Sequence, residues 1–276
     1  MTYINVRGVD HYYEWIKKPS NIIKPVMVFM HGWAGSARYW QSTAEALLDN
    51  FDCLLYDMRG FGRSHVQPDL SYELTEYAED LAVLLNQLNL ERVYINAHSM
   101  GASIATLFLN RYPQKVEKAI LTCSGIFEYD EKAFAAFYKF GGLVVKFRPK
   151  WLGKIPLADR MFMARFLHSP IPKSERQAFL EDFINADYQA ALGTIFTSVS
   201  KEQAELMPQE FAKLTVPTLL VAGEYDIIIP AELGKKAAAL NDQVELAIIP
   251  NTAHFPMLED AETYLAKVRD FLNTGF

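Results

Sequence analysis

The most constraining feature of the sequence is the segment of residues 93–101. Its apolar, β-branched run stops abruptly at Ala-His-Ser-Met-Gly, residues 97–101, and a helical pattern follows. A strand, a sharp turn and a helix with serine at the apex form a nucleophile elbow. The serine of an elbow is strained, so the residues two before and two after it must be small, as Ala97 and Gly101 are. The alternative interpretation is an ordinary strand-to-helix junction with Ser99 as an N-cap.

The length and the net charge of the chain favour a single domain that acts on a small molecule. The chain has 276 residues, 50% of them hydrophobic, which is enough for one catalytic domain with an inserted lid. The formal net charge is −6, and phosphate binding needs a basic surface, so nucleic acid is not expected as a partner. A neutral or apolar small molecule is the expected ligand.

The cysteines and the N-terminal sequence indicate a protein of a reducing compartment. Cys53 and Cys123 both lie inside apolar runs, where each is expected to be a free core residue. The N-terminal residues show no basic stretch followed by a long apolar segment, and no run reaches the length of a membrane span. A soluble cytoplasmic protein is therefore expected.

Strand and helix patterns alternate along most of the chain. The first two expected strands, 3–6 and 11–16, form a hairpin, and the later ones are apolar runs typical of a parallel sheet. The later expected strands are 25–30, 51–56, the run that leads to Ser99, 116–123, 216–222 and 244–249. The expected helices are one capped by Ser36 and ending near Leu48, 74–88, one from Ser99 to about Tyr112, and 255–271.

Two further motifs follow expected strands. His31-Gly32-Trp33 follows the strand at 25–30, and Asp-Met-Arg-Gly-Phe-Gly-Arg-Ser follows the next as residues 57–64. Together with the elbow, these motifs resemble the α/β-hydrolase superfamily, over nearly the whole chain outside the lid. The resemblance implies an α/β fold, with a mostly parallel central sheet flanked by helices and an inserted helical cap.

The resemblance also implies roles for these motifs. The backbone N–H groups of Trp33 and Met100 correspond to the oxyanion hole of the family, where fixed donors meet developing negative charge. His31 is expected to be a core histidine that bridges loop backbones. The loop of residues 57–64 is expected to be structural, with glycines at positive φ and a polar network of its Asp and Arg side chains.

Ser99, Asp226 and His254 occur in the chain order of an α/β-hydrolase triad. Each lies just beyond the carboxyl end of an expected parallel strand, where such sheets place their ligand sites. A serine hydroxyl is a poor nucleophile at neutral pH, so it needs a base, and the base needs an orienting anion. We expect His254 to be the base and Asp226 to be the anion.

Other acids and other chemistries are weighed against this triad. Glu224, Glu128 and Asp130 are alternative acids, and the Gly-x-x-Asp spacing favours Asp226 over them. Ser99 at the elbow excludes the routes of epoxide hydrolases and haloalkane dehalogenases, which need a carboxylate there. The six histidines are scattered without a metal motif, and no nucleotide-binding loop follows a strand, so neither metal nor cofactor is expected.

The alternating pattern disappears between residues 126 and 210, which are expected to form the helical cap. The expected core is 1–125 and 211–276. Residues 132–176 contain ten Lys and Arg and two acids, a net charge of +8. One interpretation is a solvated lid face. The other is a lid that contacts anionic membrane surfaces or attracts acidic, lipid-like substrates.

Aromatic side chains of the cap favour an apolar acyl or aryl substrate. The candidates for the substrate pocket are Trp33, His98, Phe137, Phe140, Phe162 and Phe166. His98 is also expected to be a packing residue, because adjacent side chains diverge and it cannot point back at Ser99.

The expected function is cofactor-free acyl transfer, with carboxylic ester hydrolysis as the first choice. Thioesters, lactones, C–C bonds of β-diketones and N-terminal peptide bonds are open to the same triad. The alternative function is a slow-turnover sensor that reports ligand occupancy to a protein partner through cap movement. The oligomeric state is open.

Overall fold

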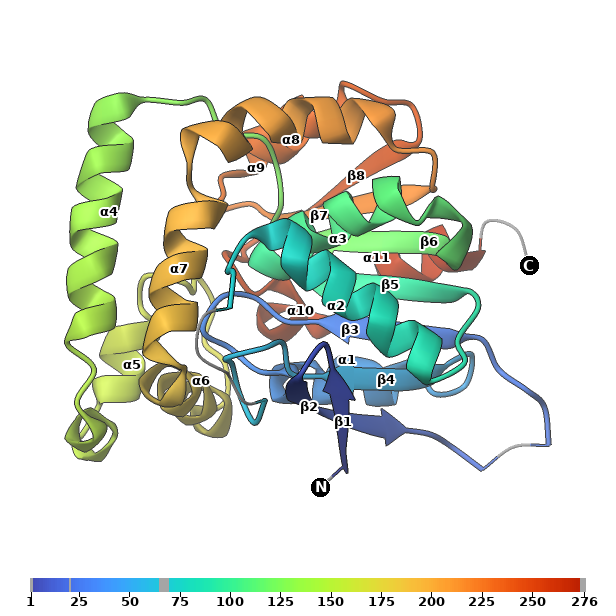
Figure 1. Ribbon diagram of the computed structural model, residues 1–276, viewed down its shortest axis with the longest axis horizontal. Coiled ribbons are helices and arrows are strands. Elements are labelled where there is room, and N and C mark those ends of the chain that lie inside the picture. The colour runs from blue at the N-terminus through green and yellow to red at the C-terminus, as the bar shows by residue number, and fades with distance from the viewer. Residues whose placement is uncertain (1, 20, 65–69, 274–276) are drawn as a thin grey trace.

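A computed structural model describes the backbone of residues 2–19, 21–64 and 70–273, without the side chains of Ala133, Phe137, Phe140 and Asn273. Its centre is an eight-stranded sheet in the order β1-β2-β4-β3-β5-β6-β7-β8 (Figure 1). The pairs β1–β2 and β2–β4 are antiparallel, and all others are parallel. The strands are β1 Thr2–Val6, β2 Val9–Ile16, β3 Val26–Met30, β4 Asp52–Tyr56, β5 Val93–His98, β6 Val116–Thr122, β7 Thr218–Gly223 and β8 Val244–Ile249. The expected mostly parallel sheet with a hairpin at one edge is confirmed.

Both faces of the sheet are covered by helices. Successive strand residues point to opposite faces, so Val28 packs in the core on one face while Phe29 packs in the core on the other. In Figure 1, α2 and α3 lie over the near face. The helices of the core are α1 Gln41–Ala46, α2 Leu74–Gln87, α3 Met100–Arg111, α9 Ala231–Ala238, α10 Pro256–Glu259 and α11 Ala261–Asn273.

The expectation that Ser36 caps a helix ending near Leu48 is wrong. A short 3-10 helix, η1 (Ala37–Trp40), comes first, and α1 follows it and ends at Ala46. The Ser36 side chain makes no capping bond. Its hydroxyl donates instead to the carboxylate of Asp182, at 2.8 Å, which belongs to the helical insertion.

The expected single C-terminal helix is two helices. The chain turns at Asp260, between α10 and α11, and the Asp260 side chain accepts a hydrogen bond from the Thr263 N–H at 3.1 Å. This bond satisfies one of the free donors at the start of α11.

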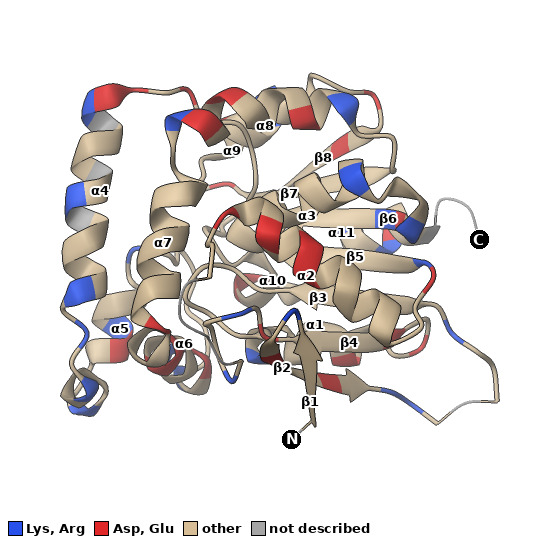
Figure 2. Cartoon of the chain, in the orientation of Figure 1, with Lys and Arg blue, Asp and Glu red and all other residues tan. Residues whose placement is uncertain are grey.

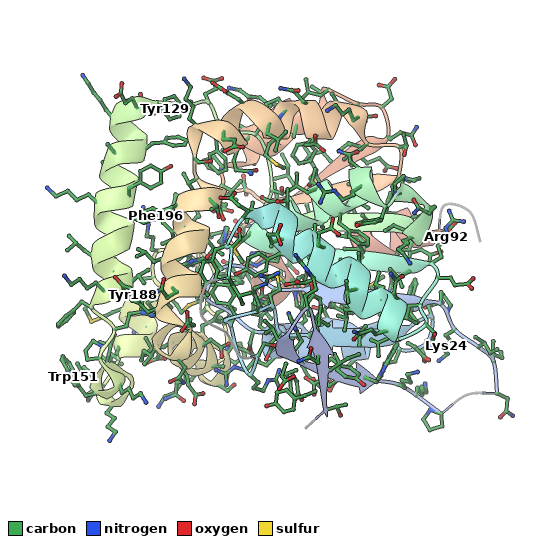
Figure 3. All side chains as sticks on the ribbon, in the orientation of Figure 1. Lys24, Arg92, Tyr129, Trp151, Tyr188 and Phe196 are labelled. Atoms are coloured by element: carbon green, nitrogen blue, oxygen red, sulfur yellow. The ribbon has the colours of Figure 1, made fainter. Side chains whose placement is uncertain are left out.

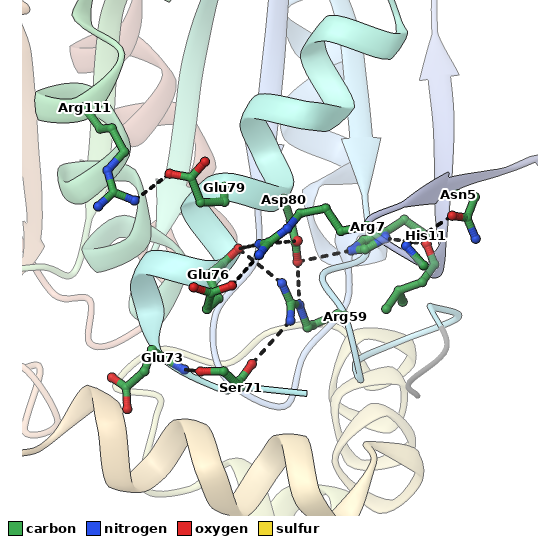
Figure 4. A network of polar contacts seen from close by, with 12 residues as sticks. Asn5, Arg7, His11, Arg59, Ser71, Glu73, Glu76, Glu79, Asp80 and Arg111 are labelled. Atoms are coloured by element: carbon green, nitrogen blue, oxygen red, sulfur yellow. Dashed lines mark hydrogen bonds and ion pairs between the residues drawn. The ribbon is translucent and has the colours of Figure 1, made fainter. Parts of the chain in front are cut away.

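The loop of residues 57–64 is a buried polar network, as expected. The Asp57 carboxylate accepts bonds from the Arg63 backbone and side chain, each at 2.8 Å. Arg59 donates to Asp80 of α2, and Asp80 also accepts a bond from Arg7 in the β1–β2 turn (Figure 4). The loop glycines Gly60 and Gly62 have φ of 77° and 55°, as expected. The network fastens the hairpin, the loop and α2 together.

Five helices and a 3-10 helix form an insertion between β6 and β7. In Figure 1 α4 is outermost, and α7 lies between it and the core. No helix in the described part of the chain is both long and apolar enough to cross a membrane. The elements are α4 Glu131–Lys146, η3 Lys150–Lys154, α5 Ala158–Met163, α6 Lys173–Asn185, α7 Tyr188–Ser198 and α8 Lys201–Lys213. The boundary at residue 210 stays a prediction, because α8 runs through it.

Asp182 on α6 fastens the insertion to the core. Its buried carboxylate accepts the Ser36 hydroxyl and the Arg38 guanidinium, the latter at 2.7 Å to one oxygen and 3.0 Å to the other. Burial raises the pKa of Asp182 to about 6, and the attraction of Arg38 and the bond from Ser36 only partly offset it. The folded protein therefore holds a proton here at pH values where the unfolded chain has lost it.

The raised pKa of Asp182 predicts that the stability of the fold depends on pH. Between about pH 4 and pH 6 the folded state binds more protons at Asp182 than the unfolded state, so stability falls as pH rises. We expect the free energy of unfolding of the wild type to fall by about 2 to 3 kcal/mol relative to Asp182→Asn across this window. Urea unfolding at several pH values measures it, with Glu181→Gln, an exposed partner of Arg38, as the control. Parallel pH curves for the wild type and Asp182→Asn would contradict the prediction.

Candidate active site

Ser99 lies at a strained turn between β5 and α3. Its backbone has φ 54° and ψ −122°, a left-handed conformation that is unusual for a residue with a side chain. A methyl group on Gly101 would overlap the carbonyl oxygen of His31, and one on Gly32 would lie 3.1 Å from the Ser99 Cβ. Ser99 occupies the N-cap position but makes no side-chain capping bond. The elbow geometry is confirmed, and the interpretation of Ser99 as a mere cap is wrong.

The structure brings Ser99, His254 and Asp226 together. His254 Nε2 lies 3.1 Å from the Ser99 hydroxyl, and His254 Nδ1 lies 2.7 Å from an Asp226 carboxylate oxygen. Asp226 and His254 are buried, whereas Ser99 is partly exposed. The loops after β7 and β8 and the turn after β5 supply the three residues, and these loops meet at one edge of the sheet because parallel strands end there.

Asp226 is held as a charged acceptor. Its other carboxylate oxygen accepts bonds from the N–H groups of Ile228 at 2.8 Å and Ile229 at 3.0 Å. Burial by itself would raise the pKa of Asp226, but His254 and the two backbone donors outweigh it and hold the pKa below its usual value. The carboxylate is therefore ionised at neutral pH.

The alternative acids are engaged elsewhere. Glu224 accepts a bond from the Asn251 N–H at 3.0 Å. Glu128 forms an exposed ion pair with Lys236 of α9. Asp130 lies directly before α4, the outermost helix.

Trp33 and Met100 each adjoin a residue of the elbow region: Met100 follows Ser99, and Trp33 follows Gly32, which packs against Ser99. Met100 is the first residue of α3, and the N–H there has no partner within a helix. Neither N–H donates a hydrogen bond to any residue that the structure describes. His31 does what a core histidine is expected to do: its Nδ1 lies 2.8 Å from the Gly32 oxygen, and its Nε2 accepts from the Met58 N–H at 2.9 Å.

Aromatic rings form an arc from Trp33 to His254. The ring of Trp33 lies 6.0 Å from that of Phe183, which stacks on Phe162 at 4.8 Å. Phe162 lies 5.8 Å from Phe166, and Phe166 lies 6.1 Å from the His254 ring. The arc unites three of the predicted pocket residues with Phe183, whose polar helical surroundings in the sequence gave no reason to single it out.

The other pocket predictions have different outcomes. The side chains of Phe137 and Phe140 lie outside the described residues. His98 is 1% exposed and packs against His254 and Phe255, with ring centres 4.9 Å and 4.8 Å away. This position fits the expected packing role of His98 better than a place in the pocket wall.

His98 belongs to a buried hydrogen-bond relay that the sequence did not reveal. The Gly32 N–H donates to the Tyr39 hydroxyl, and that hydroxyl has only one proton, so it donates to Nδ1 of His98 at 2.9 Å. Burial lowers the pKa of His98 well below its usual value, and nearby His254 lowers it further. The neutral ring then carries its proton on Nε2 and donates to the His254 carbonyl at 2.7 Å. The relay joins the loop after β3 to the loop that carries His254.

His98, Cys123 and His254 offer atoms within 4.8 Å of one another, the spacing of a metal site. The donor set does not fit a metal ion. Burial raises the pKa of the Cys123 thiol well above its usual value, whereas a metal ligand must be a thiolate. The Cys123 thiol instead lies 3.4 Å from the His254 carbonyl. Both cysteines are buried and free, as expected.

Glu259 of α10 is a second residue that the sequence did not reveal. One of its carboxylate oxygens accepts bonds from the N–H groups of Ala253 at 2.9 Å and Phe255 at 3.2 Å, the two neighbours of His254. A carboxylate that accepts two backbone bonds fixes a loop firmly, because such charge-assisted bonds are strong.

The second oxygen of Glu259 binds the chain segment 166–169, which follows α5. It accepts bonds from the N–H groups of His168 at 2.7 Å and Ser169 at 2.8 Å. In the same segment the Phe166 carbonyl accepts the N–H of His254 at 2.9 Å. Segment 166–169 and the His254 loop therefore form one hydrogen-bonded unit.

We expect Glu259→Ala to lower kcat by about 10- to 100-fold with a smaller change in KM, because His254 is displaced while Trp33, Phe162 and Phe183 of the arc lie on other segments. Glu259→Gln retains one acceptor oxygen and is expected to recover part of the loss. Steady-state kinetics measures both, with Glu262→Ala on the exposed face of α11 as the control. An effect confined to KM, or no recovery in Glu259→Gln, would argue against positioning.

Comparison with known proteins agrees with this architecture. The chain is 25% identical over 270 residues to an uncharacterized hydrolase, YugF, of Bacillus subtilis (strain 168), over 97% of this chain and 96% of the relative. The fold matches a putative lipase from Acinetobacter baumannii AYE (TM-score 0.83, 24% identity, 98% and 90% of the two chains). It also matches an esterase from Exiguobacterium antarcticum (TM-score 0.82, 21% identity, 99% of each chain). A family model described as alpha/beta hydrolase fold matches residues 25–261, and the chain therefore belongs to the α/β hydrolase fold family.

Proposed function

We propose that the protein is a serine hydrolase that cleaves a carboxylic ester, or a related acyl compound, through an acyl-enzyme. The observation that carries the proposal is the pair of hydrogen-bond contacts of His254, one with Ser99 and one with Asp226. A nucleophile within reach of a base, and a base oriented by a buried anion, is the arrangement that nucleophilic catalysis requires.

The first half of the reaction forms the acyl-enzyme. His254 carries its proton on Nδ1 and donates a hydrogen bond from it to the Asp226 carboxylate, so the Nε2 lone pair is free to accept the Ser99 proton. Ser99 Oγ attacks the acyl carbon, and the carbonyl oxygen becomes an oxyanion. The bond to the leaving group then breaks as His254 returns the proton to the leaving oxygen, and the acyl group stays on Ser99.

The second half releases the acid. His254 takes a proton from water as the water oxygen attacks the acyl carbon, and the bond to Ser99 Oγ then breaks with return of the proton to Oγ. In both halves the N–H groups of Trp33 and Met100 are proposed to bind the oxyanion. One such donor contributes about 10²- to 10³-fold to the rate.

An apolar acyl or aryl group is the proposed specificity. The aromatic arc between Trp33 and His254 supports this choice, because its rings offer apolar contacts that end beside His254. The names of similar proteins, an esterase and a putative lipase, also favour ester substrates. We propose residues 126–210 as the cap that closes over this pocket.

A burst experiment tests the proposal. Release of p-nitrophenol from short and medium chain esters is followed at several enzyme concentrations. We expect a burst of p-nitrophenol in proportion to the enzyme concentration, followed by steady turnover. The burst arises because p-nitrophenol leaves when the acyl-enzyme forms, before the slower hydrolysis of that intermediate. A burst without turnover would favour a ligand sensor over an enzyme, and the absence of release at any chain length would contradict ester hydrolysis.

A further inference from the structure

The outer end of the insertion, here called the cap tip and defined as residues 143–161, exposes large apolar side chains. Leu143 is 59% exposed, Phe147 72%, Trp151 55%, Leu157 65% and Met161 77%. Figure 3 shows Trp151 at the outer corner of the molecule, beyond the end of α4. Scattered apolar residues on a surface are ordinary, but a group of this size within nineteen consecutive residues (143 to 161) marks an interaction site.

The three apolar side chains at the end of α4 and just after it form a row. Leu143 and Phe147 are four residues apart across the end of α4, and the rings of Phe147 and Trp151 meet edge to face at 6.4 Å. Leu157 has φ 65°, a left-handed conformation that is unfavourable for a bulky side chain. A strained leucine that is nonetheless exposed fits a residue retained for contact with a partner.

Cations surround this row. Lys139, Lys146, Lys150, Lys154 and Arg160 are exposed, and none of them forms an ion pair with another described residue. Figure 2 shows Lys and Arg residues along α4 and around its lower end, with few acids among them. Unpaired lysines beside exposed aromatic rings are typical of surfaces that lie on anionic membranes.

A hollow of about 500 Å³ opens beside the row and is also basic. Lys150, Lys154 and Lys173 lie in its wall. Asp159 and Glu181 of the same wall are each already paired with an arginine. The free cations suit the phosphate of a lipid headgroup.

We infer that the cap tip docks on an anionic lipid bilayer, with its apolar row in the interface and its lysines against the headgroups. The charge distribution favours an anionic bilayer as the partner of the cap tip. Residues 132–176 carry +8 in a chain of −6, so the remainder carries −14 (−6 minus +8). A negative membrane attracts this face and repels the rest of the molecule, which orients the protein with the cap tip toward the lipid.

Docking at the cap tip brings the bilayer close to the aromatic arc. Met161 and Phe162 are neighbours on α5: the first is exposed at the tip, and the second stacks on Phe183 in the arc. The inference itself does not depend on the proposed function, because it concerns binding and its test uses protein that lacks the Ser99 hydroxyl.

The test is co-sedimentation of Ser99→Ala protein with vesicles of phosphatidylcholine, with and without phosphatidylglycerol. We expect binding to the anionic vesicles only, and weaker binding as salt is added. Lys150→Gln/Lys154→Gln is expected to weaken binding about 25-fold, because each lysine contributes about five-fold. Phe147→Ser/Trp151→Ser is expected to weaken it by more than about ten-fold.

Matched controls lie far from the tip. Ile23→Ser removes an apolar side chain that is 98% exposed beside Lys24, at the opposite end of the molecule in Figure 3. Lys235→Gln/Lys267→Gln removes two exposed charges from the core. Both controls are expected to bind like the parent, and all variants to keep its melting temperature.

Two results would overturn the inference. One is equal binding by the parent and Phe147→Ser/Trp151→Ser. The other is an absence of binding to the anionic vesicles by the parent. If the parent then forms a dimer, seen by analytical ultracentrifugation, that the same substitutions dissociate, the cap tip is an interface between two copies of the chain.

Discussion

Ser99→Ala is expected to lower kcat for p-nitrophenyl esters by about 10⁴- to 10⁶-fold and to abolish the burst. The reason is that Ser99 carries the hydroxyl group that lies within hydrogen-bond distance of His254, the proposed base. The substitution removes one oxygen atom from a partly exposed position and leaves the strained backbone of the elbow in place. Rapid-mixing kinetics and mass spectrometry of the trapped acyl-enzyme measure the two effects.

Ser103→Ala is the matched control for Ser99→Ala. Ser103 lies one turn further along α3, and its N–H donates to the Ser99 carbonyl. Its replacement is expected to leave the burst unchanged. Undiminished release by Ser99→Ala would assign the nucleophile to another residue and remove the basis of the proposed mechanism.

Asp226→Asn is expected to lower kcat by about 10⁴-fold with little change in fold. The amide has no charge to stabilise the imidazolium, and if its NH₂ group faces Nδ1 it favours the wrong tautomer of His254. The wild-type carboxylate is charged at neutral pH because its pKa lies below its usual value. Steady-state kinetics together with thermal unfolding separates a loss of chemistry from a loss of structure.

Glu224→Gln also tests which carboxylate orients His254. Glu224 is in the same loop as Asp226, but its carboxylate accepts the Asn251 N–H and does not contact His254 in the described structure. We expect its rate to stay within a few-fold of the wild type. If Glu224→Gln were the slower variant, the acid of the site would be Glu224.

The sheet and the elbow were predictable because their signals are local. The run that forms β3 is continuously apolar, and the run of β7 is nearly so, because both faces of a parallel sheet are covered; helix-forming patterns separate most of the strands. The elbow at Ser99 is marked by small residues at fixed offsets. The same logic located Asp226 and His254 at the ends of β7 and β8.

One of the two errors in the helices occurred where a distant partner decides the local structure, and the other where a helix start lies inside a continuous helical pattern. Ser36 has the chemistry of a cap, but Asp182 of the insertion, 146 residues away, takes its hydroxyl. The periodicity of the C-terminal helix runs on through Asp260, although Pro256 and Asp260 are both typical of helix starts.

The residues that support the His254 loop could not be predicted from the sequence either. Tyr39 reads as an ordinary core aromatic residue, and Glu259 as one of many acids on a helix. Each acts through a contact with a segment more than fifty residues away, for example the 59 residues between Tyr39 and His98 and the 91 between His168 and Glu259. Pattern and spacing carry no information on such contacts.

The hydrogen-bonded union of segment 166–169 with the His254 loop matters to anyone who grafts a foreign lid onto this scaffold. By sequence position the segment belongs to the lid, yet its Phe166 carbonyl holds the backbone of His254 and its N–H groups hold Glu259. A graft that replaces these four residues would disturb the ring of His254, the proposed base, and an inactive chimera would then give no information on substrate preference. Joining the foreign helices before residue 166 and after residue 169 keeps the loop of His254 native, so that a change in activity can be assigned to the new lid.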